Sequence, residues 1–204
     1  MISSDGVAEV EGDAHAIFRL ARFDPDDGAT PQQLCVRLLG SPPEMAPLLG
    51  HEATLARVTG QWRIFVRAGT AAPRARWLVC HELAEWWYQR IGYCERDIEA
   101  RCDVLGAALV APRRVFLRLR RRHGDDVRPL ARALRTTESL ALLRCGECTG
   151  EPTAVVRSAG AIVRGDAVVW PAPLTLARAH RLRRGGLRKV RIADEPSRLG
   201  LRLA

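Results

Sequence analysis

Two side chains one helical turn apart, with a glutamate beside the first, are the residues best suited to chemistry in this sequence. His81 and Glu85 stand four residues apart in His-Glu-Leu-Ala-Glu, so on a helix they point the same way. Imidazole nitrogen and carboxylate oxygen both bind zinc. Glu82 follows His81 directly, where its carboxylate can take a proton from a water molecule. The pattern predicts a metal site of the HExxE type on a helix.

A second helix offers further acidic groups. Residues 95–110 have helical spacing, and Glu99 and Asp103 lie one turn apart on the same face. The rest of this segment is small and apolar, so we expect the helix to be nearly buried, and buried acids need a partner. If the two helices face each other, these acids converge with those of the first helix around His81. A divalent cation would offset their mutual repulsion.

Together the two segments resemble the ImmA/IrrE-type metallopeptidases. That family has a β-hairpin, a helix with H-E-L-x-H, and a second helix that reads roughly E-x-x-A-N-x-F-A-A-x-L-L-M-P. Residues 77–85 and 99–112 match the two helices, and the leading glutamate and the closing proline keep register without a gap. The resemblance is clearest over residues 62–112 and extends more weakly over about the first three quarters of the chain.

The resemblance implies a zincin-like fold and assigns roles to individual residues. His81 and Glu99 correspond to metal ligands and Glu82 to the general base. Asp103 falls where the family has an asparagine or aspartate that supports the ligands. The family's second histidine falls on Glu85, which we therefore take as the third metal ligand.

The carboxylate at position 85 changes the expected chemistry. Two imidazoles and one carboxylate leave a zinc site with a charge of about +1, whereas one imidazole and two carboxylates leave it near zero. An oxygen-rich site also shifts selectivity from zinc towards harder ions such as manganese. We expect Zn, or alternatively Mn or another divalent metal, and a slower or a retired peptidase. His51 and His123 are alternative sources of the missing imidazole.

The segments that must position these residues favour an α+β fold that is mostly helical. Thr30, Pro31 and Gln33 form a helix start with a capping box, and Gly40 ends that helix. A β-hairpin is predicted over residues 54–58 and 62–67, joined by a three-residue loop. Helices are predicted over residues 7–23, 30–39, 73–90, 95–110, 113–122, 125–134 and 136–144. Short β-like runs are predicted over residues 161–163, 167–170, 190–193 and 199–203, with a basic helical stretch over 174–182.

These elements suggest three parts. We predict a metallopeptidase-like domain over residues 1–122, a helix-turn-helix-like segment over 123–150, and a basic C-terminal segment over 151–204 to which no role is assigned. The resemblance implies a metal-dependent endopeptidase that cleaves or binds a helix-turn-helix transcriptional repressor in a stress-response, mobile-element or toxin–antitoxin system. The alternative is a catalytically impaired metal-binding module that regulates transcription by binding a repressor or DNA.

The formal net charge of +9 is compatible with phosphate or acidic partners, but also with a solvated basic face. Arg128, Arg132, Arg135 and Arg144 could reach phosphates if the helix pair bound DNA. However, the second helix of the pair is rich in leucine and offers few side chains that read bases. We therefore do not expect sequence-specific DNA recognition by this helix.

The composition bears on where in the cell the protein is expected. Hydrophobic residues make up 47% of the 204 residues, which is enough to bury a core, and no apolar run approaches the roughly 20 residues that span a bilayer. The first residues lack a secretory pattern, so we expect a cytoplasmic protein. The six cysteines are scattered, and the lone Cys145-x-x-Cys148 pair is interpreted as two buried small residues rather than a zinc ribbon or a redox pair.

Overall fold

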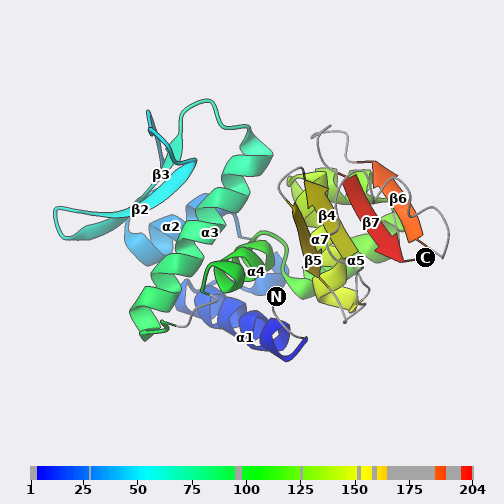
Figure 1. Cartoon of the computed structure of the whole chain (residues 1–204). Coiled ribbons are helices and arrows are strands. Elements are labelled where there is room, and N and C mark those ends of the chain that lie inside the picture. The colour runs from blue at the N-terminus through cyan, green and yellow to red at the C-terminus, as the bar shows by residue number, and fades with distance from the viewer. Residues whose placement is uncertain are drawn as a thin grey trace. The chain divides into compact units, whose positions relative to one another are not determined.

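The computed structural model describes residues 4–27, 29–94, 98–124, 126–150, 153–157, 160–164, 187–191 and 199–203. Over these residues the fold is α+β and mostly helical, as predicted. The chain forms two compact units (Figure 1). Gly6–Arg118 is called the site unit below, and Met1–Asp5 with Leu119–Ala204 is called the C-terminal unit. No helix in the described part of the chain is both long and apolar enough to cross a membrane.

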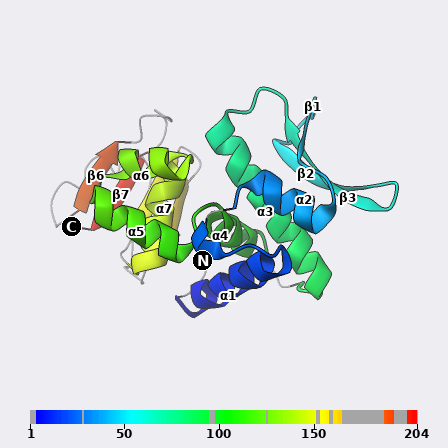
Figure 2. The same cartoon turned by 180° about the vertical axis from the view of Figure 1, so that it is seen from behind.

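The site unit consists of helices and a small sheet, which contacts α2 and α3. Its helical elements are α1 (Ser4–Leu20), the 3-10 turn η1 (Pro25–Asp27), α2 (Pro31–Leu39), α3 (Ala72–Ile91), α4 (Ile98–Val110) and the start of α5 (Arg113–His123). Its strands are β1 (Glu44–Ala46), β2 (Ala53–Val58) and β3 (Gln61–Arg67). Helix α2 contacts both α3 and β3, and the view from behind shows it between them (Figure 2).

The start of α2 confirms the predicted capping box. The Thr30 hydroxyl accepts a hydrogen bond from the Gln33 N–H at 3.2 Å, and the Gln33 side chain accepts one from the Thr30 N–H at 2.8 Å. Pro31 stands in the first turn, and Gly40 closes the helix with a φ of 82°. These local contacts fix where α2 begins and ends.

The three strands form a mixed sheet in the order β1-β3-β2. The antiparallel pair β2–β3 confirms the predicted hairpin, but its loop has two residues instead of three, because Gln61 pairs with Val58. Thr59 and Gly60 take up the turn with φ values of 49° and 87°, a conformation that suits the twist of a hairpin. Strand β1, parallel to β3, lies in the segment after α2, for which no strand was predicted.

The C-terminal unit contains a helix pair and a second sheet. Helices α6 (Val127–Leu134) and α7 (Glu138–Thr149) follow the end of α5. Strands β4 (Thr153–Arg157), β5 (Gly160–Arg164), β6 (Leu187–Arg191) and β7 (Leu199–Leu203) form an antiparallel sheet in the order β5-β4-β7-β6. Strands β5, β6 and β7 overlap three of the predicted β-like runs, whereas β4 was not predicted. The predictions for residues 167–170 and 174–182 lie outside the described residues.

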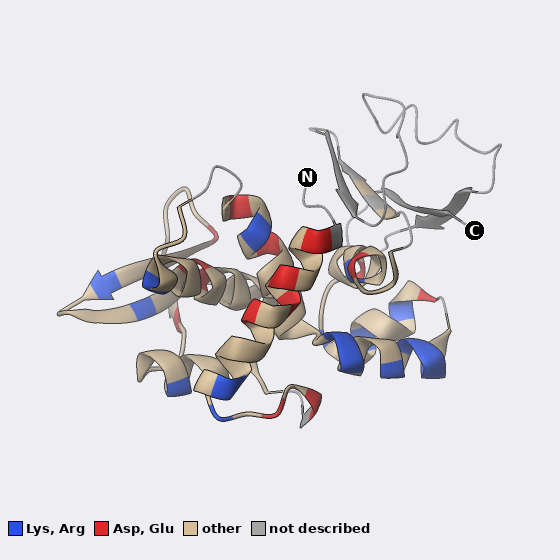
Figure 3. Ribbon diagram, turned by 90° about the horizontal axis from the view of Figure 1, so that it is seen from below, with Lys and Arg blue, Asp and Glu red and all other residues tan. Residues whose placement is uncertain are grey.

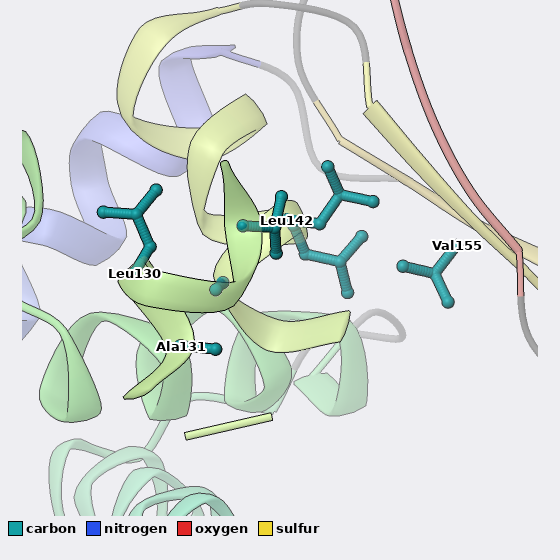
Figure 4. Packing of buried hydrophobic residues seen from close by; sticks show 7 residues of the cluster. Leu130, Ala131, Leu142 and Val155 are labelled. Atoms are coloured by element: carbon teal, nitrogen blue, oxygen red, sulfur yellow. The ribbon is translucent and has the colours of Figure 1, made fainter. Parts of the chain in front are cut away.

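A compact apolar cluster joins the helix pair to this sheet. Leu130 and Ala131 of α6 pack in one cluster with Leu142 of α7 and Val155 of β4 (Figure 4). Leu142 and Val155 are fully buried. The helix pair therefore belongs to the core of its unit.

Helix α7 is longer and more buried than the sequence indicated. Its residues from Ser139 to Cys148 are all buried, because α7 contacts α6 on one side and β4 and β5 as well. Arg144 has an exposed fraction of 0%, and its Nη1 lies 3.3 Å from Glu147 Oε2. The prediction that Arg144 reaches phosphates is therefore wrong. Cys145 and Cys148 are buried, as predicted.

Candidate metal centre

Helix α3 carries three of the predicted site residues. It begins after Ala71 with Pro73 in its first turn, and it ends at Gly92, whose N–H bonds to the carbonyls of Gln89 and Tyr88. His81 and Glu82 lie near the middle of this helix with exposed fractions of 9% and 6%, and Glu85, one turn later, is half-buried. A continuous helix thus holds the motif at the spacing that the sequence implies.

Helix α4 brings a second carboxylate to the same place. One donor atom each from His81, Glu85 and Glu99 lie within 4.8 Å of one another. His81 Nε2 is 3.6 Å from Glu99 Oε2. Glu99 stands in the first turn of α4 and its side chain is 76% exposed, so this side of the group faces solvent. His51 and His123, the alternative imidazoles, do not belong to this group.

Asp103 lies on the other side of the His81 ring. Its Oδ1 is 3.2 Å from His81 Nδ1, which is within ion-pair distance, although the pair does not meet hydrogen-bond geometry. One ring nitrogen therefore faces Glu99 and the other faces a carboxylate. Histidines that bind metals usually have such a carboxylate on the second nitrogen, where it fixes the orientation of the ring.

Close packing of the two helices depends on Gly106 of α4. A Cβ atom at this position would lie 3.0 Å from the His81 backbone nitrogen and 3.1 Å from its Cα. Any larger residue would have to push α4 away from α3. Gly106 therefore sets the distance between the helix that carries His81 and the helix that carries Glu99 and Asp103.

Burial and neighbouring charges perturb the protonation of the buried acid. Burial, followed by the negative charge of Glu85, raises the pKa of Glu82 to about 7. His81 and a backbone hydrogen bond from Leu55 act in the opposite direction. Leu55 belongs to β2, so an edge strand of the sheet reaches the carboxylate of Glu82.

The histidine and the second glutamate are also perturbed. Burial is the largest influence on His81 and lowers its pKa, but Asp103, Glu82 and Glu85 together outweigh it, so the net pKa of His81 is raised. Burial raises the pKa of Glu85, with His81 opposing and Glu99 adding to that rise. The site thus holds several acidic groups close together, and this arrangement favours the binding of either a proton or a metal cation.

One wall of the site is aromatic. The rings of Trp77 and His81 have centroids 5.2 Å apart at an interplanar angle of 45°. The Arg74 guanidinium lies 4.5 Å from the centre of the Trp77 ring and 2.6 Å from Glu52 Oε2. This stack holds the Trp77 ring beside His81, one turn earlier on α3.

The donor set fits a divalent cation. One imidazole nitrogen and two carboxylate oxygens are ligands that zinc accepts, and the predominance of oxygen also suits manganese. His81 Nδ1 is buried and lies 3.2 Å from Asp103 Oδ1, so the ring nitrogen that does not face Glu99 stands against a carboxylate. These features match a histidine held for metal binding.

The structure brings all five predicted site residues together around His81. Three further contributors to the site were not predicted from the sequence: Gly106, Trp77 and the backbone of Leu55. An isolated glycine within a helical pattern indicates close packing, so the role of Gly106 could have been predicted from the sequence. No sequence pattern indicates the role of the Leu55 backbone, because that role depends on the strand pairing of β2.

Comparison with known proteins relates the chain to others by its fold. No protein-family model matches the chain, and no curated protein matches it. Among solved structures, it is similar to one described as a Mycobacterium tuberculosis transcriptional regulator, with a TM-score of 0.62 and 11% sequence identity. The similarity covers 96% of this chain and 87% of that chain. At this identity the likeness establishes a shared fold and carries no information about chemistry.

Proposed function

We propose that this chain is a metal-dependent endopeptidase-like protein of the ImmA/IrrE type. The observation that carries the proposal is the convergence of donor atoms from His81, Glu85 and Glu99 within 4.8 Å, with the carboxylate of Glu82 beside them. These three residues would hold Zn, or alternatively Mn or another divalent ion. When bound, the ion supplies Lewis acidity towards a peptide carbonyl.

Within this proposal the chain's own residues bind, orient and transfer a proton. Glu82 takes a proton from water at its carboxylate and passes it to the leaving amine. Asp103 orients the His81 ring from Nδ1. Strand β2 is an edge strand whose Leu55 backbone bonds to Glu82, so an extended peptide added along this edge would pass the proton acceptor.

The substrate we propose is a helix-turn-helix transcriptional repressor, in the cytoplasm, as part of a stress-response, mobile-element or toxin–antitoxin system. The resemblance of residues 62–112 to the peptidase family supports this choice. The similar solved structure is described as a transcriptional regulator, which accords with a role in transcription.

The proposal is tested by incubating metal-loaded protein with candidate repressors and following cleavage by mass spectrometry. Wild type should cut a repressor at one site. The variant Glu82→Gln should bind metal as wild type does and should not cut. Glu44→Gln serves as the matched control, because Glu44 is paired with Arg63 on the hairpin and takes no part in the donor group. Equal cleavage by wild type and Glu82→Gln would rule out the proposed role of Glu82.

The second candidate function is a catalytically impaired module that binds metal and grips a repressor without cutting it. Glu85 at the position of the second histidine and the 76% exposure of Glu99 favour it, because both weaken the hold on an ion. In this case wild type binds metal and a repressor but cuts nothing. Cleavage that appears only in Glu85→His would identify the site as a retired peptidase.

A further inference from the structure

The excess positive charge of this protein belongs entirely to one unit. The site unit holds 14 arginines and 14 acidic residues, whereas the C-terminal unit holds 18 basic and 9 acidic residues. The formal net charge of +9 therefore resides in the C-terminal unit. All but one of the basic residues in the chain are arginines. A surplus so confined calls for an explanation specific to that unit.

Helix α6 carries arginines on one side and buried apolar residues on the other. Arg128, Arg132 and Arg135 recur at helical spacing and are exposed. On the opposite side of α6, Val127, Leu130 and Ala131 are buried in the cluster with α7 and β4. Arg128 and Arg132 are four residues apart, a rise of about 6 Å along the helix. Arginine thus occupies the outer face of α6 from its first turn to its C-terminal cap.

The last turn of α5 adds two more exposed arginines, Arg121 and Arg122. In Figure 3 blue segments gather on α5 and α6, whereas the charged segments along most of α1 are red. These five residues, Arg121, Arg122, Arg128, Arg132 and Arg135, are called the arginine face below. Favourable interaction with a helix dipole would explain basic residues at the end of α5, but not arginines along the whole of α6.

Ion pairs within the protein do not neutralise the charges of the arginine face. Arg128 Nε lies 3.8 Å from Glu138 Oε1, a long contact at a side chain that is 56% exposed. Arg121, Arg122 and Arg132 have no ion-pair partner among the residues that the structure describes. Asp126, the N-cap residue of α6, accepts a hydrogen bond from the Arg128 backbone N–H.

We propose that the arginine face binds the phosphate backbone of duplex nucleic acid without reading its sequence. The planar guanidinium pairs bidentately with phosphate, so an arginine-only surface suits this partner. Helix α7, the second helix of the pair, is buried from Ser139 to Cys148 and has no face left to enter a groove. Phosphate contacts position a protein on DNA, but only contacts to base edges specify sequence.

A membrane surface fits the arginine face less well. Binding to lipid by a basic helix needs apolar side chains that enter the bilayer. Among the described residues, the exposed large apolar side chains are Leu20, Val36, Met45, Leu49 and Ile91, none of which belongs to α5 or α6. The apolar sides of these two helices are already used in packing, as Phe116 of α5 and Leu130 of α6 show.

The test measures binding of the full chain to a labelled duplex of random sequence by fluorescence anisotropy at a series of salt concentrations. Five phosphate contacts predict that log K falls with log salt with a slope of about −4.5 or steeper. Affinity should then drop at least about 500-fold between about 50 and 200 mM salt. Two duplexes of different sequence should bind equally.

A triple variant, Arg121→Gln with Arg122→Gln and Arg132→Gln, should make the slope less steep by about 2.7. The charge-matched control changes three exposed arginines of the site unit, Arg19, Arg22 and Arg37, to glutamine and should keep the wild-type slope. Circular dichroism checks that each variant is folded. Should the triple variant fail to fold, the single variants are compared, and each should make the slope less steep by about 0.9.

Three results would overturn the proposal. The first is no salt-dependent binding to the duplex. The second is equal loss in the triple variant and in its charge-matched control, which would indicate net charge instead of a surface. The third is binding of polyglutamate or of anionic lipid vesicles as tight as that of the duplex. None of these outcomes depends on peptidase activity, so this proposal and the proposed function fail separately.

Discussion

Glu82 should make the metal-free protein less stable as the pH rises. Its carboxyl is 6% exposed, and burial with the charge of Glu85 raises its pKa from 4.5 to about 7. Because the folded-state pKa lies above the unfolded-state value, the folded protein binds more protons than the unfolded chain between about pH 4.5 and pH 7. The free energy of unfolding therefore falls as the pH rises through this interval.

The size of this effect follows from the difference between the two pKa values. One pKa unit corresponds to about 1.4 kcal/mol, so full ionisation of Glu82 costs the folded state about 3 kcal/mol. Between about pH 5 and pH 8 the loss should be about 2–3 kcal/mol. The raised pKa of His81 acts in the same direction, because stability from a protonated histidine is lost as the pH rises through its folded pKa.

Urea unfolding in the presence of a chelator, followed by tryptophan fluorescence, measures this loss. Four of the five tryptophans lie in the site unit, so the signal reports mainly on the unit that holds Glu82. In Glu82→Gln the amide stays neutral and can still accept the bond from Leu55, so most of the pH dependence should disappear. Glu44→Gln, at a half-buried ion pair, should retain it. Identical pH profiles for wild type and Glu82→Gln would refute the account of a buried, ionisable carboxylate.

Three further substitutions test how the site is built. Gly106→Ala should destabilise the protein by about 1–3 kcal/mol and weaken metal binding at least about tenfold, because the new methyl group lies 3.0 Å from the His81 backbone; calorimetry with and without metal measures both effects. Leu142→Ala should cost the C-terminal unit about 2–5 kcal/mol in chemical unfolding and leave metal affinity unchanged. Thr30→Ala should cost about 1 kcal/mol in thermal unfolding through loss of the α2 cap, and no loss there would contradict the capping geometry.

Features that depend on neighbouring residues along the chain could be predicted from the sequence. The capping box at Thr30, the helix end at Gly40 and the hairpin β2–β3 rest on short-range hydrogen bonds and turn preferences, and all three are present. The same holds for His81 and Glu85, whose spacing on α3 follows from helix geometry alone. Their approach to Glu99 was inferred from the acids on a predicted buried helix.

Features that depend on distant segments could not be predicted. Strand β1 has three residues and owes its existence to a parallel pairing with β3, which no local pattern announces. Arg144 was placed at an exposed helix end because β4, which contacts α7, was not foreseen. Glu99 belongs to a helix that is buried from Val104 onwards, yet its own side chain is exposed, because it lies in the first turn before α4 packs against α3.

Metal content is the measurement that bears most directly on the proposed site. Purified protein is loaded with Zn or Mn, desalted and analysed by mass spectrometry, and the affinity is measured by titration calorimetry. The proposal predicts one ion per chain in wild type, loss of the ion in His81→Ala, and tighter zinc binding in Glu85→His, because an added imidazole restores the softer donor set. If neither wild type nor Glu85→His binds any metal, His81, Glu85 and Glu99 do not form a metal centre and the proposed function falls with it.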